Sequence, residues 1–130
     1  MRLKTRPDRV VGLYNTNRFQ AMINSCSPNL KHSPVEGRRQ LIYPFIVLEA
    51  KRERDAPGFR AVEEQTAFFV RRFLKLQDDL RIARGGNIDP LVWFFASQGE
   101  EWRLYGGILE DDRVVIFYLF YAARRCIYQR

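Results

Sequence analysis

The chain has 130 residues, of which 46% are hydrophobic and 14% aromatic. That is enough to fill the core of a single domain spanning residues 1–130, and it excludes an intrinsically disordered chain. The 22 basic and 15 acidic residues give a net charge of +7, which favours a polyanionic partner such as nucleic acid because lysine and arginine contacts to phosphates release counterions.

The cysteines and the apolar runs argue against a disulfide-rich, zinc-thiolate or membrane-spanning protein. Cys26 and Cys126 are the only cysteines and lie far apart, so neither a disulfide framework nor a thiolate zinc site is supported. No apolar run follows the basic start of the chain. The longest strongly apolar stretch, residues 114–123, is shorter than the roughly 20 residues of a membrane-spanning helix. We therefore expect an intracellular protein, cytoplasmic or nuclear, with no membrane partner.

Hydrophobic periodicity and turn residues predict seven secondary-structure elements. In chain order they are a strand at 9–14, a short helix at 18–25, a strand at 41–50, a long helix at about 58–84, and strands at 91–96, 102–108 and 114–121. Residues 98–101 and 110–112 are predicted to be turns. Residues 27–39 are predicted to be a loop, and a lone His32 within it gives little support for a Ser-His-Asp triad or a His-rich metal site.

The strand at 41–50 and the long helix carry the strongest signals. The strand is a nearly continuous apolar run, typical of a strand buried on both faces, with Pro44 near its start or on a bulge. One face of the helix is an apolar stripe made of Val62, Phe69, Phe73, Leu76 and Leu80. The opposite face carries Arg71, Arg72, Lys75, Asp78, Asp79 and Arg81. Strand, crossover helix and strand predict an α/β fold, a mixed central sheet with parallel strands and one long helix packed across it.

Glu49-Ala50-Lys51 ends the buried strand and is the most informative motif. Because side chains alternate along a strand, Glu49 and Lys51 are expected on one face and Ala50 on the other. A carboxylate and an ammonium group both lose hydration at the edge of an apolar strand, so each needs a partner. The two groups either pair with each other, or stay solvated at the strand tip, or belong to a catalytic site.

Two further polar residues extend this motif. Asp8 follows a proline and opens another predicted strand, 41 residues before Glu49. Gln65 lies 14 residues after Lys51, in the early turns of the long helix. An ordinary exposed polar residue and a site residue explain Gln65 equally well.

These motifs resemble those of a known superfamily. The residues that carry the resemblance to the PD-(D/E)xK nucleases are Pro7-Asp8, Glu49-x-Lys51 and Gln65. Residues 43–80 and 90–105 are also similar to uncharacterised fungal proteins assigned to that superfamily, so the resemblance covers nearly the whole chain. It implies a restriction-endonuclease-like fold and metal-dependent hydrolysis of nucleic-acid phosphodiester bonds. DNA is the first substrate expected and RNA the second.

The resemblance also implies a role for each motif residue. Asp8 and Glu49, with the carbonyl group of Ala50, would bind Mg²⁺ or Mn²⁺, hard cations that take oxygen ligands and keep several waters. A bound metal lowers the pKa of its water and neutralises charge that grows on the phosphate oxygens. Lys51 would orient the attacking water or stabilise the transition state, and Gln65 would steady the site.

The sequence departs from the superfamily pattern in three places. The 41 residues from Asp8 to Glu49 are more than a simple hairpin needs, so they must hold an inserted helix and loop. Many members carry a glutamate on a helix before the first strand, whereas only seven residues precede Asp8, so we expect this helix to be missing. Phe69 stands four residues after Gln65, where some branches have a tyrosine. The alternative to a nuclease is therefore a catalytically inactive nuclease-like fold that acts as a nucleic-acid or protein binding module.

Overall fold

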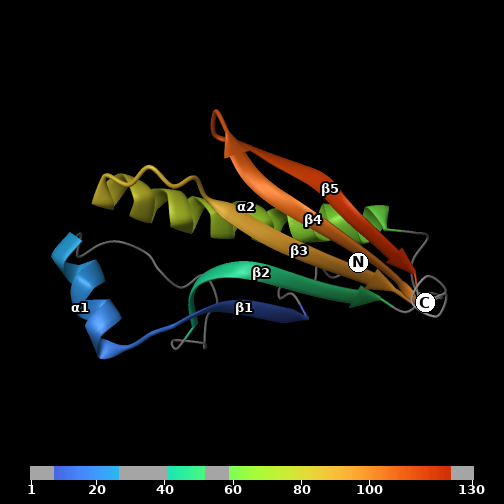
Figure 1. Cartoon of the computed structure of the whole chain (residues 1–130), viewed down its shortest axis with the longest axis horizontal. Helices are drawn as coiled ribbons and strands as arrows, with labels where there is room; N and C mark the ends of the chain where they lie inside the picture. Colours follow the sequence, from blue (N-terminus) through green and yellow to red (C-terminus); the bar gives the residue numbers. More distant parts are fainter. Residues whose placement is uncertain (1–7, 27–40, 52–58, 124–130) are drawn as a thin grey trace.

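A computed structural model describes residues 8–26, 41–51 and 59–123 of the chain (Figure 1). The helices and strands follow the order expected from the sequence. They are β1 (Arg9–Tyr14), α1 (Asn17–Cys26), β2 (Leu41–Lys51), α2 (Arg60–Arg84), β3 (Leu91–Gln98), β4 (Glu101–Glu110) and β5 (Arg113–Ala123). The predicted loop at 27–39, His32 within it, and the predicted helix start at residue 58 lie outside the described residues.

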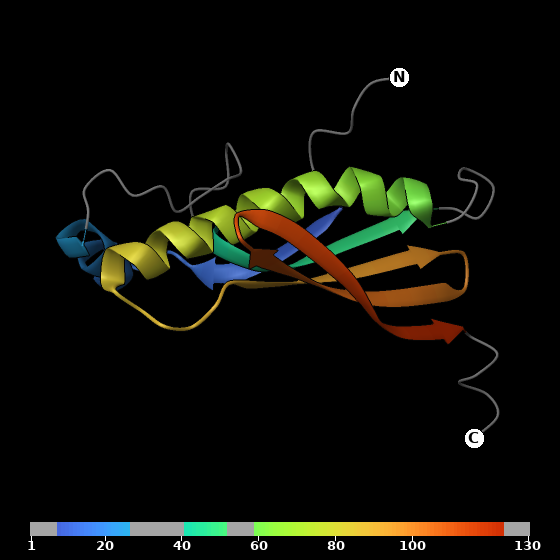
Figure 2. The ribbon, with the colours of Figure 1, turned by 90° about the horizontal axis from the view of Figure 1, so that it is seen from above.

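The five strands form one mixed sheet in the order β1-β2-β3-β4-β5. β2 and β3 are parallel, whereas the other three neighbouring pairs are antiparallel. α2 joins the parallel pair, because two parallel neighbours need a crossover that returns the chain to the same end of the sheet. Figures 1 and 2 show α2 lying lengthwise across one face of the sheet. The predicted α/β fold with a mixed sheet and a long crossover helix is therefore confirmed.

One face of α2 supplies much of the core. Its fully or almost fully buried apolar side chains are Val62, Phe69, Val70, Phe73, Leu74 and Leu76. The predicted stripe is thus confirmed for four of its five members, while Leu80 is only partly buried. Periodicity places Asp78 on the solvent face, and this is wrong: the residue is 8% exposed and its carboxylate pairs with Arg81. An ion pair within the helix is what makes burial of that carboxylate tolerable.

β2 is irregular at Tyr43-Pro44, where its pairing with β1 shifts register around Gly12. Pro44 therefore lies at a bulge, as the sequence predicts. Tyr43 has φ 44°, a left-handed value that is uncommon for a residue other than glycine. A Cβ on Gly12 would lie 2.8 Å from the carbonyl oxygen of Ile42, so the close approach of the two backbones requires glycine at this position.

Tight turns join the last three strands. Asp111 and Asp112 have φ values of 47° and 62°, the signature of a type I′ hairpin turn, so the turn predicted at 110–112 is confirmed at these two residues. Glu110 instead ends β4 and pairs with Arg113. Gly99 takes φ 61° in the turn between β3 and β4. Glu101 is predicted as a turn residue and is instead the first residue of β4, because it pairs with Gln98 across the hairpin.

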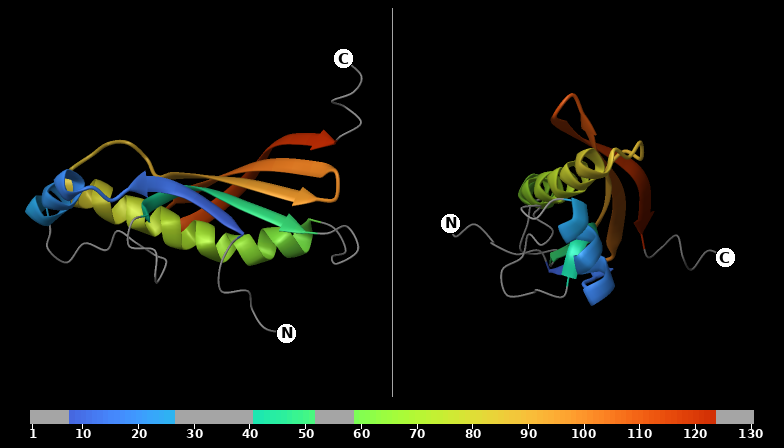
Figure 3. Two further views of the ribbon diagram at one scale, coloured as in Figure 1. Left: turned by 90° about the horizontal axis from the view of Figure 1, so that it is seen from below. Right: turned by 90° about the vertical axis from the view of Figure 1, so that its left-hand side faces the viewer.

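The two ends of the sheet differ in what surrounds them. α1 packs at the end where β2 begins and α2 finishes (Figures 1 and 3). There Ile23 of α1 joins Ile42, Tyr43 and Leu76 in a second small core cluster. The other end, where β2 finishes and α2 begins, carries Asp8 and residues 49–51. Neither helix, over the residues described, is long and apolar enough to cross a membrane.

Candidate active site

Antiparallel pairing of β1 with β2 places the first residues of β1 beside the last residues of β2. Arg9 pairs with Leu48, so Asp8 lies next to Glu49 although 41 residues separate them in the chain. The backbone N–H of Asp8 donates to Glu49 Oε1 at 3.0 Å, and the backbone N–H of Ala50 donates to Asp8 Oδ2 at 2.8 Å. The two residues that the resemblance assigns to one metal site are therefore neighbours in the structure.

The two carboxylates differ in burial. Glu49 is 2% exposed, on the face of the sheet that α2 covers, whereas Asp8 is exposed. A buried carboxylate is costly unless it accepts hydrogen bonds, and the N–H of Asp8 supplies one of them. The pair thus has one member set into the core and one facing solvent, an arrangement in which an ion can approach from the side of Asp8.

The structure places the other predicted site residues less completely. Ala50 contributes its N–H to Asp8, and its carbonyl group as a metal ligand stays a prediction. The backbone of Lys51 pairs with Gln98 at the end of β2, but the side chain of Lys51 lies outside the described residues. Gln65 is half-buried on the second turn of α2, and its part in the site also stays a prediction.

A row of paired residues extends the site across the sheet. Glu49 on β2 pairs with Ala96 on β3, and Ala96 pairs with Arg103 on β4. Paired residues on neighbouring strands project to the same face, so Arg103 shares the α2 side with Glu49. At about 4.8 Å per strand spacing, their Cα atoms are roughly 10 Å apart. The row therefore places Arg103 two strands away from Glu49 on the same face of the sheet.

The first turn of α2 fixes the position of Arg103. Its guanidinium lies 4.2 Å from the ring centroid of Phe59 and 3.5 Å from Glu63 Oε1. The same Glu63 oxygen accepts a hydrogen bond from the hydroxyl group of Tyr105. Burial, and then this hydrogen bond, raise the pKa of Tyr105 to about 12. Tyr105 is therefore a neutral donor at physiological pH, and it helps to orient the carboxylate that holds Arg103.

Sequence reasoning missed Glu63, Arg103 and Tyr105. The signal that could have found two of them is the two-residue period of β4, which places Arg103 and Tyr105 on one face together. Since Tyr105 belongs to the core beneath α2, that face is the one a helix covers. An arginine on a helix-covered face needs an acidic partner, and Glu63 is the only acidic residue in the first turn of α2.

The donor atoms at Asp8 and Glu49 fit a hard divalent cation. Mg²⁺ keeps several waters, so one or two protein carboxylates suffice to bind it beside a phosphate. An ionised carboxylate has about four lone-pair sites, so it can accept hydrogen bonds and also bind a cation. Over the residues described, no three or more His, Cys, Asp or Glu side chains group together in a way that could hold a metal ion. The candidate is therefore a two-carboxylate site completed by water.

No protein family, no curated protein and no solved structure matches the chain. The function must be inferred from the residues themselves.

Proposed function

We propose that the chain is a restriction-endonuclease-like domain that uses Mg²⁺ or Mn²⁺ to hydrolyse phosphodiester bonds in nucleic acid. DNA is the first substrate to test and RNA the second. The observation that carries the proposal is the pair of backbone hydrogen bonds that holds Asp8 beside Glu49. The βαβ unit, the net charge of +7 and the resemblance of the Asp8, Glu49 and Lys51 motif to PD-(D/E)xK nucleases support it further.

In this proposal each residue has a distinct task. Asp8 and Glu49 bind the ion, with the carbonyl group of Ala50 as a third ligand. When bound, the ion supplies a more acidic water and neutralises charge on the phosphate. Lys51 orients the attacking water or stabilises the charge that develops in the transition state. Arg103, fixed by Phe59 and Glu63, contacts a neighbouring phosphate of the same strand, since arginine matches phosphate oxygens with paired donors.

A second candidate function is nucleic-acid or protein binding without cleavage. One observation favours it: each carboxylate already accepts a backbone N–H, and Glu49 is 2% exposed. These bonds also lock the start of β1 to the end of β2, a structural task that needs no metal. The two candidates differ in whether a divalent cation and Lys51 matter.

Cleavage of labelled DNA and RNA separates the two candidates. Wild-type protein should cut in the presence of Mg²⁺ or Mn²⁺ and should not cut in excess EDTA. Lys51→Ala should abolish cleavage while the protein still binds the metal, because the lysine acts on charge that exists mainly in the transition state. Glu49→Gln should abolish both, although its amide oxygen can still accept the N–H of Asp8.

Matched controls keep the result interpretable. Glu110→Gln makes the same change in an exposed residue at the hairpin between β4 and β5, and it should cut like the wild type. Circular dichroism should show that every variant is folded. If the folded wild type cuts neither nucleic acid with either metal, the nuclease proposal is wrong, and salt-dependent binding of the same nucleic acids then supports the non-catalytic module.

A further inference from the structure

A pocket of about 420 Å³ lies at the end of α2 that is remote from Asp8 and Glu49. Its volume falls in the range of about 300–1,000 Å³ that is typical of small-molecule sites. Its walls come from β1, the start of β2, the last two turns of α2 and residues 86–90. The lining residues that decide its chemistry are Leu13, Phe45, Leu80, Arg81, Arg84 and Ile88.

Gln77 is one of the residues that line this pocket. Its side-chain amide nitrogen donates to the carbonyl oxygens of Pro44 at 3.2 Å and Leu91 at 3.1 Å. Its amide oxygen accepts the backbone N–H of Leu91 at 2.9 Å. One side chain thus ties the starts of both parallel strands to the helix. Beside it Tyr43, another lining residue, has φ 44°, and such strain tends to collect at binding sites.

The rim of the pocket presents apolar side chains to solvent. Of the lining residues, Ile88 is 83% exposed and Leu13 is 42% exposed. Phe45 and Leu80, which also line the pocket, are partly buried. Covering these groups would remove apolar surface from water, so an apolar ligand tail is favoured here.

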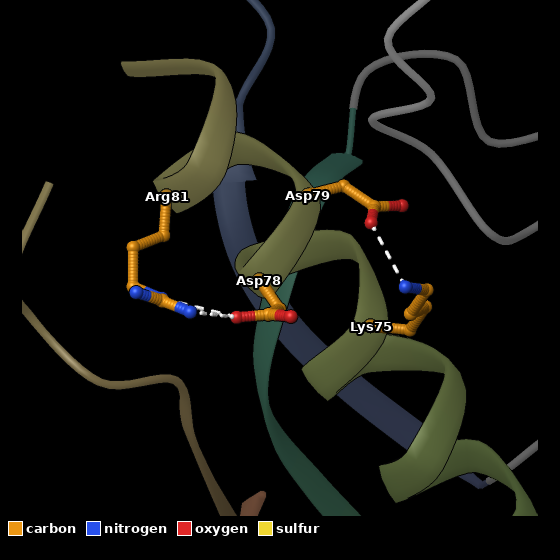
Figure 4. A network of polar contacts seen from close by, with 4 residues as sticks. All are labelled: Lys75, Asp78, Asp79 and Arg81. Atoms are coloured by element: carbon orange, nitrogen blue, oxygen red, sulfur yellow. Dashed lines mark hydrogen bonds and ion pairs between the residues drawn. The ribbon is translucent and has the colours of Figure 1, made fainter. Parts of the chain in front are cut away.

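Arginine side chains stand on one wall of the same pocket. Arg81 donates from Nε and from one terminal nitrogen to Asp78 Oδ1, at 3.0 and 2.7 Å, and this carboxylate is almost buried. Figure 4 shows this pair on one side of α2, away from the Lys75–Asp79 pair on the other. Asp78 therefore fixes the direction of the Arg81 guanidinium, which has five N–H donors in total. Arg84 lines the pocket three residues further on, where helix geometry makes it a neighbour of Arg81.

A cation at the last turn of a helix also serves to offset the helix dipole. That task asks only for charge near the helix end. It does not account for a guanidinium held by a buried carboxylate, nor for exposed leucine and isoleucine side chains around the same opening. An anionic group with an apolar tail satisfies all three features together.

We propose that this pocket binds a small amphiphilic anion, a carboxylate with an apolar chain of medium length. The carboxylate contacts the guanidinium groups of Arg81 and Arg84, since planar arginine donors match a carboxylate in pairs. The tail packs against Phe45, Leu80 and Ile88. This site is separate from the two-carboxylate site at the other end of α2, and its ligand does not depend on whether the chain is a nuclease.

Calorimetric titration with three ligands of equal chain length tests the charge and the tail. Octanoate should bind saturably with one site per chain. Octanol should bind at least about tenfold more weakly, because it lacks the charge-assisted hydrogen bonds. Octylammonium should show no saturable binding, and acetate, which has the charge without the tail, should show none either.

Substitutions at exposed positions test the place of binding. Arg84→Gln should weaken octanoate binding about tenfold, and Ile88→Asp should abolish it, since a carboxylate at the rim repels the ligand and wets its tail. The matched controls are Arg71→Gln and Phe68→Ser, which change an exposed arginine and an exposed apolar residue elsewhere on α2. Both controls should bind octanoate like the wild type.

Each contrary result overturns the proposal. Equal binding of octanoate and octylammonium would show that the pocket does not select an anion. If octanoate does not bind the wild type saturably, the pocket is not a site for this class of ligand. Equal loss in Phe68→Ser and Ile88→Asp shows binding to apolar surface in general. If a variant fails to fold by circular dichroism, the comparison of the three ligands on the wild type still decides.

Discussion

The polar groups at the two ends of β2 obtain their hydrogen-bond partners in opposite ways. Where β2 finishes, main-chain N–H groups of Asp8 and Ala50 satisfy the carboxylates of Glu49 and Asp8. Where β2 begins, the side chain of Gln77 satisfies main-chain groups of Pro44 and Leu91. At the first end the backbone positions charged side chains, and at the second a neutral side chain positions the backbone.

This difference has a consequence for function. A backbone that holds carboxylates leaves charged oxygens at the carboxyl ends of the parallel strands, where ligands of α/β sheets commonly bind. A side chain that ties the starts of the two parallel strands to the helix stands beside a pocket lined by apolar groups and two arginines. We therefore expect ions at the Asp8–Glu49 end and amphiphilic molecules at the Gln77 end.

Phe73→Ala should give the largest effect, because this residue is 1% exposed in the main core cluster beneath α2. Loss of its ring should lower the free energy of unfolding by about 3–5 kcal/mol. Urea denaturation measures this change. Phe68→Ala, at a position 63% exposed on the same helix, should change it by less than about 0.5 kcal/mol. Similar losses in the two variants would contradict the assignment of the core face.

Gln77→Leu should affect the pocket at one end of β2 without affecting the Asp8–Glu49 site at the other. Removing the amide leaves one backbone N–H and two carbonyl groups without this partner, which should cost about 1–3 kcal/mol. Octanoate binding should weaken while Mn²⁺ binding stays unchanged, as calorimetry can show. Gln20→Leu is the control, because the side chain of Gln20 donates to the exposed side chain of Asn24 alone over the residues described. Loss of Mn²⁺ binding in Gln77→Leu would mean that the two ends are coupled.

Tyr105→Phe should destabilise the Asp8–Glu49 end by about 1 kcal/mol through loss of the hydrogen bond to Glu63. It should also change the response to alkali. The pKa of Tyr105 is raised to about 12, so the folded wild type holds this proton more tightly than the unfolded chain does. That stabilisation is complete below about pH 10 and is lost as the pH rises through about 12. Urea denaturation between pH 8 and 11.5 should show a shallower decline for the variant.

Lys75→Ala should have the smallest effect on stability, because the Lys75–Asp79 pair belongs to neither end of β2. The hydrogen bond to Asp79 raises the pKa of Lys75, but the two side chains are 63% and 40% exposed and the bond joins neighbouring helix turns. Pairs of this kind contribute about 0.3–0.5 kcal/mol, and salt screens them. A thermal melt should therefore change little, and a large loss would show that this pair supports the packing of α2.

Local patterns were sufficient to predict the elements. The apolar run of β2, the stripe on α2 and the turn at Asp111-Asp112 are local signals that residue chemistry determines directly. The proximity of Asp8 to Glu49 was expected from the resemblance to the PD-(D/E)xK nucleases, because a position at a strand end does not show which strand lies beside it. Asp78 was assigned to the wrong face because periodicity does not register an ion pair to a neighbour three residues away.

The rest depends on contacts between segments far apart in the chain. Which strand lies beside β3, and in which register, decides that Arg103 shares a row with Glu49. The three hydrogen bonds of Gln77 link residues 14 and 33 positions away, and nothing in the neighbourhood of Gln77 indicates them. The bulge at Tyr43 likewise depends on Gly12 across the β1–β2 pair.

Thermal melts with and without Mn²⁺ test most directly whether Asp8 and Glu49 form an ion site. At a Mn²⁺ concentration 100 times the dissociation constant, binding should stabilise the wild type by about 2.7 kcal/mol and raise its melting temperature. Glu49→Gln and Asp8→Asn should melt at or above the metal-free wild type, because like charges are no longer adjacent, and Mn²⁺ should not shift them. Glu110→Gln should respond to Mn²⁺ like the wild type. An absent shift in the wild type, or equal shifts in all four proteins, would contradict the account.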